Sequence, residues 1–245
     1  MTLRDVIRIA EAEEGYLEKA SNACLDDKTA NAGNANYTKY ARDLDAISGW
    51  YNGPKQGYDW CAVFVEWCFI RAFGVDLAKK VLPHGIYNAG CTQARAMYSA
   101  AGILSDLPQF GDQVFFKNSA GQIVHTGLVV NLTKDSIQTV EGNTSSLAGV
   151  VPNGGCVRHK SYPRSYNRLA GFGHPRYNLL PEDEATDETR YNTLTEIERD
   201  CPWAAPTVEK LLRTQALLGD GSGLDLSRDM LRLLVINDRA GCYGP

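Results

Sequence analysis

The chain opens with apolar residues at helical spacing, namely Leu3, Val6, Ile7 and Ala10. Positions i, i+3, i+4 and i+7 share one face of a helix, so this spacing predicts a helix over about residues 2–14 that ends at Gly15. Residues 20–36 are rich in Asn, Asp, Ala and Gly without a period. We therefore predict a long surface loop there, followed by a short helix near residues 37–43.

Residues 61–73 combine aromatic and aliphatic side chains on most sides and stop at Gly74. A helix that is apolar almost all round is buried, so this segment is expected to form the central helix of its domain. A further helix is predicted over about residues 92–101, before Gly102.

After Gly102 the hydrophobic period changes to two, which is typical of strands. Val, Ile and Phe are frequent, and Asn, Gly, Ser and Asp separate the runs. The predicted strands are residues 112–117, 123–132, 136–141, 155–162 and about 170–172. Helices followed by consecutive strands indicate an α+β fold with an antiparallel sheet.

Beyond Tyr177 the composition changes to a linker and a second module. Residues 181–188 are highly charged and lack large apolar side chains, so we place an acidic linker over residues 178–190. Two amphipathic helices, residues 203–218 and 226–240, are predicted on either side of a glycine-rich turn. Their apolar positions are Val208, Leu211, Leu212, Leu218, Met230, Leu233 and Leu234. The expected product is a small helical hairpin in residues 191–245 that docks on another surface.

Length and charge exclude some classes of protein. A chain of 245 residues is long enough for one core and a small extra module. Residues 1–177 carry 18 Lys and Arg against 16 Asp and Glu, whereas residues 178–245 carry 7 against 13. Neither part has the concentrated basic surface that phosphate backbones require, so no nucleic-acid partner is expected.

No apolar run reaches the roughly 18 residues of a membrane span, and the first residues lack a signal-peptide pattern. We therefore expect synthesis in the cytoplasm and no membrane insertion. The seven cysteines have no compact spacing pattern, which favours free thiols over a disulfide framework.

Cys61 is the cysteine best placed to act as a nucleophile. A thiol attacks as its thiolate, and the positive end of a helix and a nearby imidazole both lower its pKa. Cys61 opens the aromatic helix directly after Gly57–Trp60. The other cysteines are predicted in the helix interior, in loops or at ends of elements, with no partner visible in the sequence.

His125 is the preferred base because it begins an apolar strand, whereas His84 and His174 adjoin prolines and His159 lies late in the domain. A hairpin turning over Thr133-Lys134 sets His125 opposite Gly142, and a slip of one residue changes that partner to Glu141 or Asn143. Either of these two side chains could hold the imidazole in the correct tautomer.

Four motifs give the chain a resemblance to a known family. They are Gly57-Tyr-Asp-Trp-Cys61, Phe110-Gly-Asp-Gln-Val-Phe-Phe116, Val124-His-Thr-Gly-Leu128 and Val140-Glu-Gly-Asn-Thr144. In this order they resemble the CHAP (cysteine, histidine-dependent amidohydrolase/peptidase) family, part of the wider NlpC/P60 and papain-like group. The resemblance implies a papain-like fold, with helices packed on an antiparallel sheet, over residues 1–177.

The resemblance also implies an activity, cleavage of an amide bond in bacterial peptidoglycan. The bond would be that of N-acetylmuramoyl-L-alanine or one within the stem or cross-bridge peptide. Carried over, Cys61 is the nucleophile, His125 the general base, Glu141 the orienting acid and Asn143 a support. The Cys61 backbone N–H would meet the oxyanion, with Gln56 as a weak second donor.

Further expectations concern ligands and partners. Trp60 and Trp50, with Gln56, are candidate substrate contacts, although aromatic residues beside a core helix more often simply pack. No cofactor is expected; the alternative is calcium in the Asp/Asn-rich loop Leu25–Asn34, which lacks a known spaced acidic pattern. Zinc on Cys61, Cys68 and His125 has no supporting ligand spacing.

The C-terminal module looks like a shortened S-layer-homology-type helix pair and the tail of CHAP endolysins. This likeness implies association with the cell wall, or a homo-oligomer through the helices. The expected protein is a phage or prophage endolysin acting at the bacterial wall. The alternatives are a wall-binding protein without turnover and a toxin that uses the same chemistry on competing cells.

Overall fold

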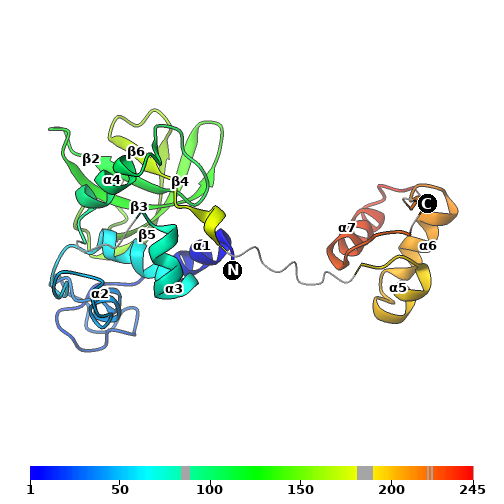
Figure 1. Ribbon diagram of the computed structural model, residues 1–245, viewed down its shortest axis with the longest axis horizontal. Coiled ribbons are helices and arrows are strands. Elements are labelled where there is room, and N and C mark those ends of the chain that lie inside the picture. The colour runs from blue at the N-terminus through cyan, green and yellow to red at the C-terminus, as the bar shows by residue number, and fades with distance from the viewer. Residues whose placement is uncertain (84–88, 181–189, 220, 222, 245) are drawn as a thin grey trace. The chain divides into compact units, whose positions relative to one another are not determined.

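The computed structural model describes residues 1–83, 89–180, 190–219, 221 and 223–244. The chain divides into two compact units, Met1–Pro181 and Glu182–Pro245 (Figure 1). Most of the predicted acidic linker falls on residues 181–189, which lie outside the described residues.

The first helices begin where a side chain satisfies the free backbone N–H groups. Helix α1 (Leu3–Ala12) starts after Thr2, whose N–H donates to the Asp5 carboxylate at 2.8 Å. Helix α2 (Lys39–Asp45) starts after Thr38, whose hydroxyl accepts from the N–H of Ala41 at 3.1 Å. Both helices lie within two residues of their predicted limits.

Helix α3 (Cys61–Val81) runs through the core, as the sequence predicts. Every residue from Cys61 to Phe69 is buried. Gly74 interrupts the helix with a φ of 73°, but the helix resumes and continues to Val81. The predicted end at Gly74 is therefore a kink, because a left-handed residue breaks the helix only locally when apolar side chains beyond it still pack. Helix α4 (Cys91–Ala100) follows and ends before Gly102.

Six strands form one antiparallel sheet in the order β1-β6-β2-β3-β4-β5. The strands are β1 (Leu104–Ser105), β2 (Gln113–Lys117), β3 (Ile123–Leu132), β4 (Ser136–Thr144), β5 (Cys156–Pro163) and β6 (Leu169–Gly173). The two-residue β1 is too short to carry a period and was not predicted. A short 3-10 helix, η1 (Tyr177–Leu179), follows the sheet in the N-terminal unit.

The main core lies between helices α1 and α3 and one face of the sheet, as Figure 1 shows. Val6 and Phe64 from the helices share this cluster with Leu128 and Val140 from β3 and β4. The contact is close, because a Cβ added at Gly142 would lie 2.6 Å from the Cβ of Phe64. The predicted α+β fold, with helices packed on an antiparallel sheet, is confirmed.

In its described residues, the C-terminal unit contains three helices, α5 (Leu194–Asp200), α6 (Ala205–Arg213) and α7 (Arg228–Arg239). The prediction of C-terminal helices is confirmed, but the predicted hairpin of two helices omits α5. Thr193 and Glu196 form the capping box that begins α5.

This unit has a hydrophobic cluster of its own, whereas the sequence suggested that it was too short for a large core. Buried members include Ile197, Val208, Leu231 and Val235. The predicted apolar positions Leu218, Met230 and Leu233 are instead exposed.

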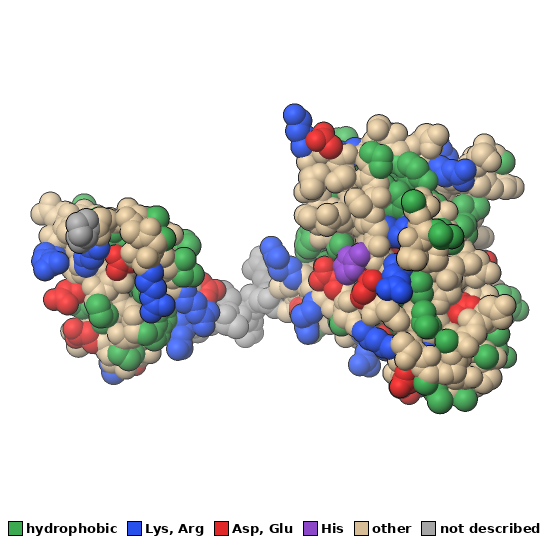
Figure 2. All heavy atoms as spheres, turned by 180° about the vertical axis from the view of Figure 1, so that it is seen from behind, with side chains coloured by type: hydrophobic (Ala, Val, Ile, Leu, Met, Phe, Trp, Pro, Cys, Tyr) green, Lys and Arg blue, Asp and Glu red, His purple; other side chains and the backbone are tan. Residues whose placement is uncertain are grey.

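The described surface carries charges of both signs, interspersed on the face of the N-terminal unit that Figure 2 shows. No helix in the described ranges combines the length and the apolar character needed to cross a bilayer.

Candidate active site

A pocket of about 390 Å³ contains the side chain of Cys61. Its walls come from the loop before α3, the start of α4 and the start of β3. The lining residues are Asn52, Lys55, Tyr58, Asp59, Cys61, Ala89, Gly90, Cys91 and Val124. The pocket combines a thiol with charged and aromatic groups, which suits a polar, peptide-like ligand.

Cys61 stands at the pocket because the residue before it is fixed in the core. Trp60 is 0% exposed, and its indole N–H donates to Glu18 at 2.9 Å. Cys61 then begins α3, where the backbone N–H of Ala62 lies toward its sulfur and lowers the thiol pKa. This is the helix-start position that the sequence predicts for a nucleophile.

Cys61 lines the pocket together with Cys91, a neighbour that sequence reasoning missed. The interaction with Cys91, followed by burial, raises the pKa of Cys61 well above its usual value. The pKa of Cys91 is lowered, first by the same interaction and then by backbone N–H groups at the start of α4.

The expectation that only Cys61 opens a helix is therefore wrong. Cys91 is the first residue of α4 and has Cys61 as its partner. Its place directly before the predicted helix 92–101 was the available signal. The partnership itself depends on tertiary packing.

The structure brings His125 and Glu141 together. Both side chains are 0% exposed, and the Nε2 of His125 lies 2.9 Å from a carboxylate oxygen of Glu141. The hydroxyl groups of Thr139 and Tyr162 also donate to Glu141, at 2.6 and 3.2 Å. Burial beside this carboxylate raises the pKa of the Tyr162 hydroxyl. Thr139 and Tyr162 were not predicted to support the site.

The strand register brings these two side chains together across Gly127. Leu132 lies opposite Ile137 beside the turn, and after a register shift between Val129 and Asn131, Leu128 lies opposite Val140, one residue away from the predicted pairing. Continued along the strands, this register puts Gly127, and not His125, opposite Glu141. Gly127 packs against Glu141, where an added Cβ would lie 2.5 Å from the Cγ of Glu141. Only a glycine leaves this space for the Glu141 side chain next to His125.

The Nδ1 of His125 is buried and has no hydrogen-bond partner among the described residues. If Nε2 donates its proton to Glu141, then Nδ1 carries the free lone pair of the neutral ring. His125 itself does not line the Cys61 pocket, but its chain neighbour Val124 does. Among the described residues, no hydrogen bond joins the thiol of Cys61 to His125.

The side chain of Asn143 has different partners from that of Glu141. It adopts the left-handed conformation, with a φ of 56°, and is 0% exposed. Its side-chain amide donates to Asp59 at 3.5 Å, and its side-chain oxygen accepts from the N–H of Gly155 at 3.2 Å. Asn143 therefore holds Asp59, which lines the pocket, and among the described residues no hydrogen bond joins its side chain to the imidazole.

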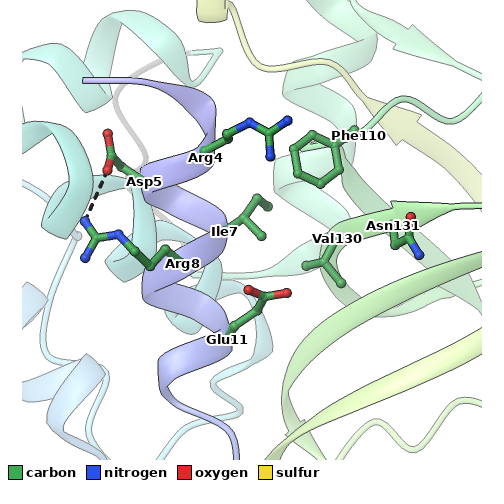
Figure 3. Close-up of a pocket in the computed structure, with 8 residues that line it drawn as sticks. All are labelled: Arg4, Asp5, Ile7, Arg8, Glu11, Phe110, Val130 and Asn131. Atoms are coloured by element: carbon green, nitrogen blue, oxygen red, sulfur yellow. Dashed lines mark hydrogen bonds and ion pairs between the residues drawn. The ribbon is translucent and has the colours of Figure 1, made fainter. Parts of the chain in front are cut away.

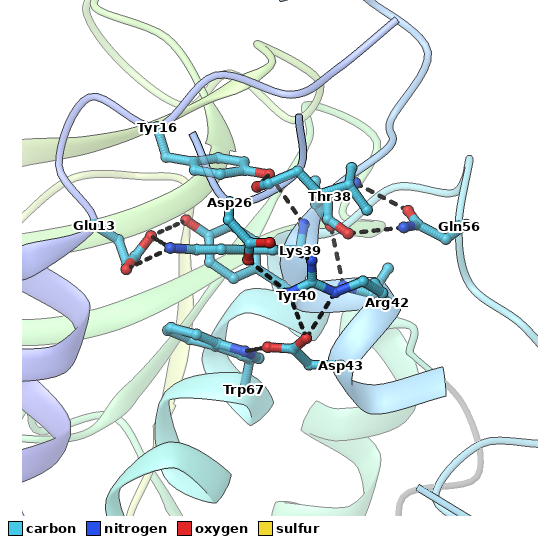
Figure 4. Close-up of polar contacts among 12 residues, drawn as sticks. Glu13, Tyr16, Asp26, Thr38, Lys39, Tyr40, Arg42, Asp43, Gln56 and Trp67 are labelled. Carbon is cyan, nitrogen blue, oxygen red and sulfur yellow. Dashed lines mark hydrogen bonds and ion pairs between the residues drawn. The ribbon is translucent and has the colours of Figure 1, made fainter. Parts of the chain in front are cut away.

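The three predicted substrate contacts are not in the pocket. Trp60 and Trp50 are 0% and 1% exposed and belong to the main core, so we do not retain them as substrate contacts. Gln56 donates to the carbonyl of Thr38 at 2.8 Å and accepts from its N–H at 2.9 Å (Figure 4). These bonds commit both ends of the Gln56 amide, so we do not retain it as an oxyanion donor.

Trp50 and the adjacent Tyr51 instead hold a buried carboxyl on α3. Both donate to the same oxygen of Glu66, at 3.0 and 2.5 Å. Glu66 is 2% exposed, and its second oxygen has no partner among the described residues. Burial raises the pKa of Glu66 from 4.5 to about 8, against the lowering effect of the two hydrogen bonds.

This pKa predicts a pH dependence of stability. Between pH 4.5 and about 8 the folded state holds a proton on Glu66 that the unfolded state has lost, so the free energy of unfolding falls as the pH rises. The slope is at most about 1.4 kcal/mol per pH unit. Glu66→Gln cannot ionise, and we expect a smaller fall between pH 5.5 and 7.5 in urea unfolding. An unchanged fall would contradict this; exposed Glu11→Gln is the control.

A second carboxylate–imidazole pair joins Asp112 of the Gly-Asp motif to His174. Asp112 is 2% exposed and bonds to the Nδ1 of His174 at 2.7 Å. Burial raises the pKa of Asp112 to about 6. The sequence predicts His174, next to a proline, in a loop. The pair joins the start of β2 to the end of β6, which is a structural role.

In the loop proposed for calcium, the two carboxylates are engaged by the protein. Asp26 pairs with Arg42 at 2.7 Å, and Asp27 accepts from two backbone N–H groups at 2.8 Å. The backbone of Lys19 pairs with that of Ala32 in this loop, and its ammonium lies over the ring of Tyr16 at 4.5 Å. Within the ranges that the structure describes, no group of three His, Cys, Asp or Glu side chains could hold a metal.

Another pocket, of about 600 Å³, lies between α1 and β3 (Figure 3). Figure 3 shows Arg4 reaching toward Phe110, and its guanidinium lies 5.8 Å from the centre of that ring. No cysteine or histidine lines this pocket. It therefore offers no nucleophile, unlike the pocket of Cys61.

Residues 53–143 match the family model described as CHAP domain. The match includes Cys61, Cys91, His125, Glu141 and Asn143, and it supports a relationship of the N-terminal unit to the CHAP, papain-like family. No curated protein matches the chain.

Proposed function

We propose, from the CHAP match over residues 53–143, that this protein is a cysteine hydrolase of amide bonds in bacterial peptidoglycan. CHAP domains are generally cysteine, histidine amidohydrolases or peptidases. In this proposal Cys61 is the nucleophile, His125 the base and Glu141 the group that orients the imidazole.

One observation carries the assignment of roles. Glu141 engages Nε2 of His125 and leaves Nδ1 without a partner among the residues described. A neutral imidazole in this tautomer has its basic nitrogen free, which is the state that a general base needs. Cys61, at a helix start within the same matched region, supplies the thiol.

The reaction begins when the Cys61 thiol turns from Cys91 to Nδ1 of His125. His125 takes the proton, and the thiolate attacks the amide carbonyl to form a tetrahedral intermediate. The Cys61 backbone N–H faces the oxyanion. The imidazolium, held by Glu141, then returns the proton to the leaving amine. Water releases the acyl group as a carboxylic acid and restores the thiol.

The pocket supports a peptide as the substrate. Lys55 offers an ammonium group and Asp59 a carboxylate on the same wall. Peptidoglycan stem peptides carry both carboxyl and amine groups, so each charge of the pocket has a counterpart in such a ligand. Asn143, through its hydrogen bond to Asp59, positions one of these charges.

The test is the chemical nature of the fragments released from purified walls of defined composition. We expect mass spectrometry to find fragments with a newly formed amine and a newly formed carboxyl group, and their masses identify the bond. Heat-denatured protein is the control. Release of sugar reducing ends alone, or of nothing, would contradict an amide hydrolase.

For the whole chain we propose the role of an endolysin, with the C-terminal unit serving wall association or self-association. Exposed apolar side chains on α7, Met230, Leu233 and Ile236, support a contact surface on that unit. Wall pull-down and size-exclusion chromatography of the full chain and of Leu233→Glu test this. Unchanged behaviour in both assays would contradict a contact role for α7.

A further inference from the structure

The two thiols in the pocket form a pair. Cys61 is the first residue of α3 and Cys91 the first residue of α4, and both line the same pocket of about 390 Å³. Cys61 is buried, whereas Cys91 is partly exposed. Two helix starts thus bring two sulfur atoms to one pocket, where the two thiols interact.

The other cysteines have different surroundings. Cys68 is 0% exposed inside α3, Cys156 donates to the carbonyl of Thr144, and Cys201 donates to the hydroxyl of Tyr191. Cys24 and Cys242 are exposed. In the part of the chain that the structure describes, Cys61 and Cys91 are the cysteines for which a thiol–thiol contact is found.

The pair has the chemical asymmetry that disulfide formation uses. The interaction with Cys61 and backbone N–H groups at the start of α4 lower the pKa of Cys91, so Cys91 is the more readily ionised sulfur. The interaction with Cys91 and burial raise the pKa of Cys61, so Cys61 is the sulfur that holds its proton more firmly. Thiolates react with peroxides, whereas thiols do not, and a neighbouring thiol then resolves the oxidised sulfur.

We propose that Cys61 and Cys91 form a reversible disulfide when the protein meets a hydroperoxide, and that this bond closes the pocket to catalysis. The Cys91 thiolate attacks the peroxide, takes one oxygen to become a sulfenic acid and, with one proton, releases water from hydrogen peroxide. The Cys61 sulfur then attacks this sulfenic acid, and a second water leaves. In total, two thiols and one hydrogen peroxide give one disulfide and two waters.

The effect on hydrolysis rests on the proposed function, since a sulfur held in a disulfide cannot attack a carbonyl. A dithiol reductant reverses the bond by exchange and restores both thiols. The protein would thus be inactive in an oxidising medium and active in a reducing one.

The test is peptide mapping of the full-length protein after brief treatment with hydrogen peroxide. Remaining thiols are blocked with N-ethylmaleimide before digestion without reductant. We expect a linked peptide pair containing residues 61 and 91, lighter by two hydrogen atoms than the separate peptides and absent after dithiothreitol. The link should persist in Cys24→Ser, the exposed control, and vanish in Cys91→Ser.

Two results would overturn the proposal: both cysteines still blocked by maleimide after peroxide, or both oxidised singly with no linked pair. Mapping does not depend on activity, so it separates this proposal from the proposed function. If the link forms but reduced protein leaves walls intact, the disulfide stands and the hydrolase assignment fails. If reduced protein digests walls and no link forms, the hydrolase stands and the disulfide fails.

Discussion

Replacing Cys61 with alanine is expected to abolish wall hydrolysis, with kcat/KM lower by at least about 10⁴-fold. The reason is that no other thiol lies at the start of α3, and an alanine there cannot form the acyl intermediate. The measurement is the loss of turbidity of purified cell walls, with initial rates compared at equal protein concentration.

Cys68→Ala is the matched control for this prediction. Cys68 lies on the same helix, in its buried interior, and has no role in the proposed chemistry. It should keep most of the activity, while circular dichroism shows that both variants fold. Equal lysis by Cys61→Ala and the unchanged protein would rule out Cys61 as the nucleophile. A protein that binds walls without turnover would show no lysis even unmutated, and its pull-down would survive loss of Cys61 and His125.

Replacing Glu141 with glutamine is expected to lower kcat/KM by about 10²- to 10⁴-fold while leaving the fold intact. A glutamine offers an amide N–H as well as an oxygen, so the side chain can turn and donate to Nε2 of His125. That places the ring proton on Nδ1, the nitrogen that the proposed reaction needs free. The loss of charge also removes support for the imidazolium.

The split between kcat and KM separates this role from a structural one. With Glu141 replaced, kcat should fall while KM changes little, because the carboxylate holds the imidazole and does not line the pocket. Tyr162→Phe is the control, since it removes one hydroxyl bond to Glu141 but keeps the charge; we expect a loss of about tenfold or less. Full activity of Glu141→Gln would contradict the orienting role.

Part of the candidate site could be predicted from local sequence patterns. The position of Cys61 at a helix start, the strand that carries His125 and the residue Glu141 could be named from local patterns. The spacing of apolar residues along the chain reveals whether a segment is a helix or a strand. The limits of β3 therefore agree with the prediction residue for residue. Choosing between Glu141 and Asn143 was not possible at that level, because a slip of one residue in one direction puts Glu141 opposite His125 and a slip in the other direction puts Asn143 there.

The roles assigned to large side chains failed for a related reason. Trp50 and Trp60 precede the nucleophile in the chain. Their rings are buried in the core, because removing them from water is more favourable than leaving them exposed in a groove. Their N–H groups find buried carboxylates, Glu66 and Glu18, which lie far from them in sequence. Nothing in the local sequence identifies such partners.

The amino-acid order by itself determined the α+β class, the extent of most helices and strands, and the residue types available for thiol chemistry. This was possible because hydrophobic periodicity, helix capping and the ending of helices at glycine each depend on only a few neighbouring residues. Only the tertiary structure decided the hairpin register, the Glu141–His125 bond, the turning of Asn143 toward Asp59 and the meeting of Cys61 with Cys91. These contacts join residues 16 to 84 positions apart, and packing of whole elements against each other brings them together.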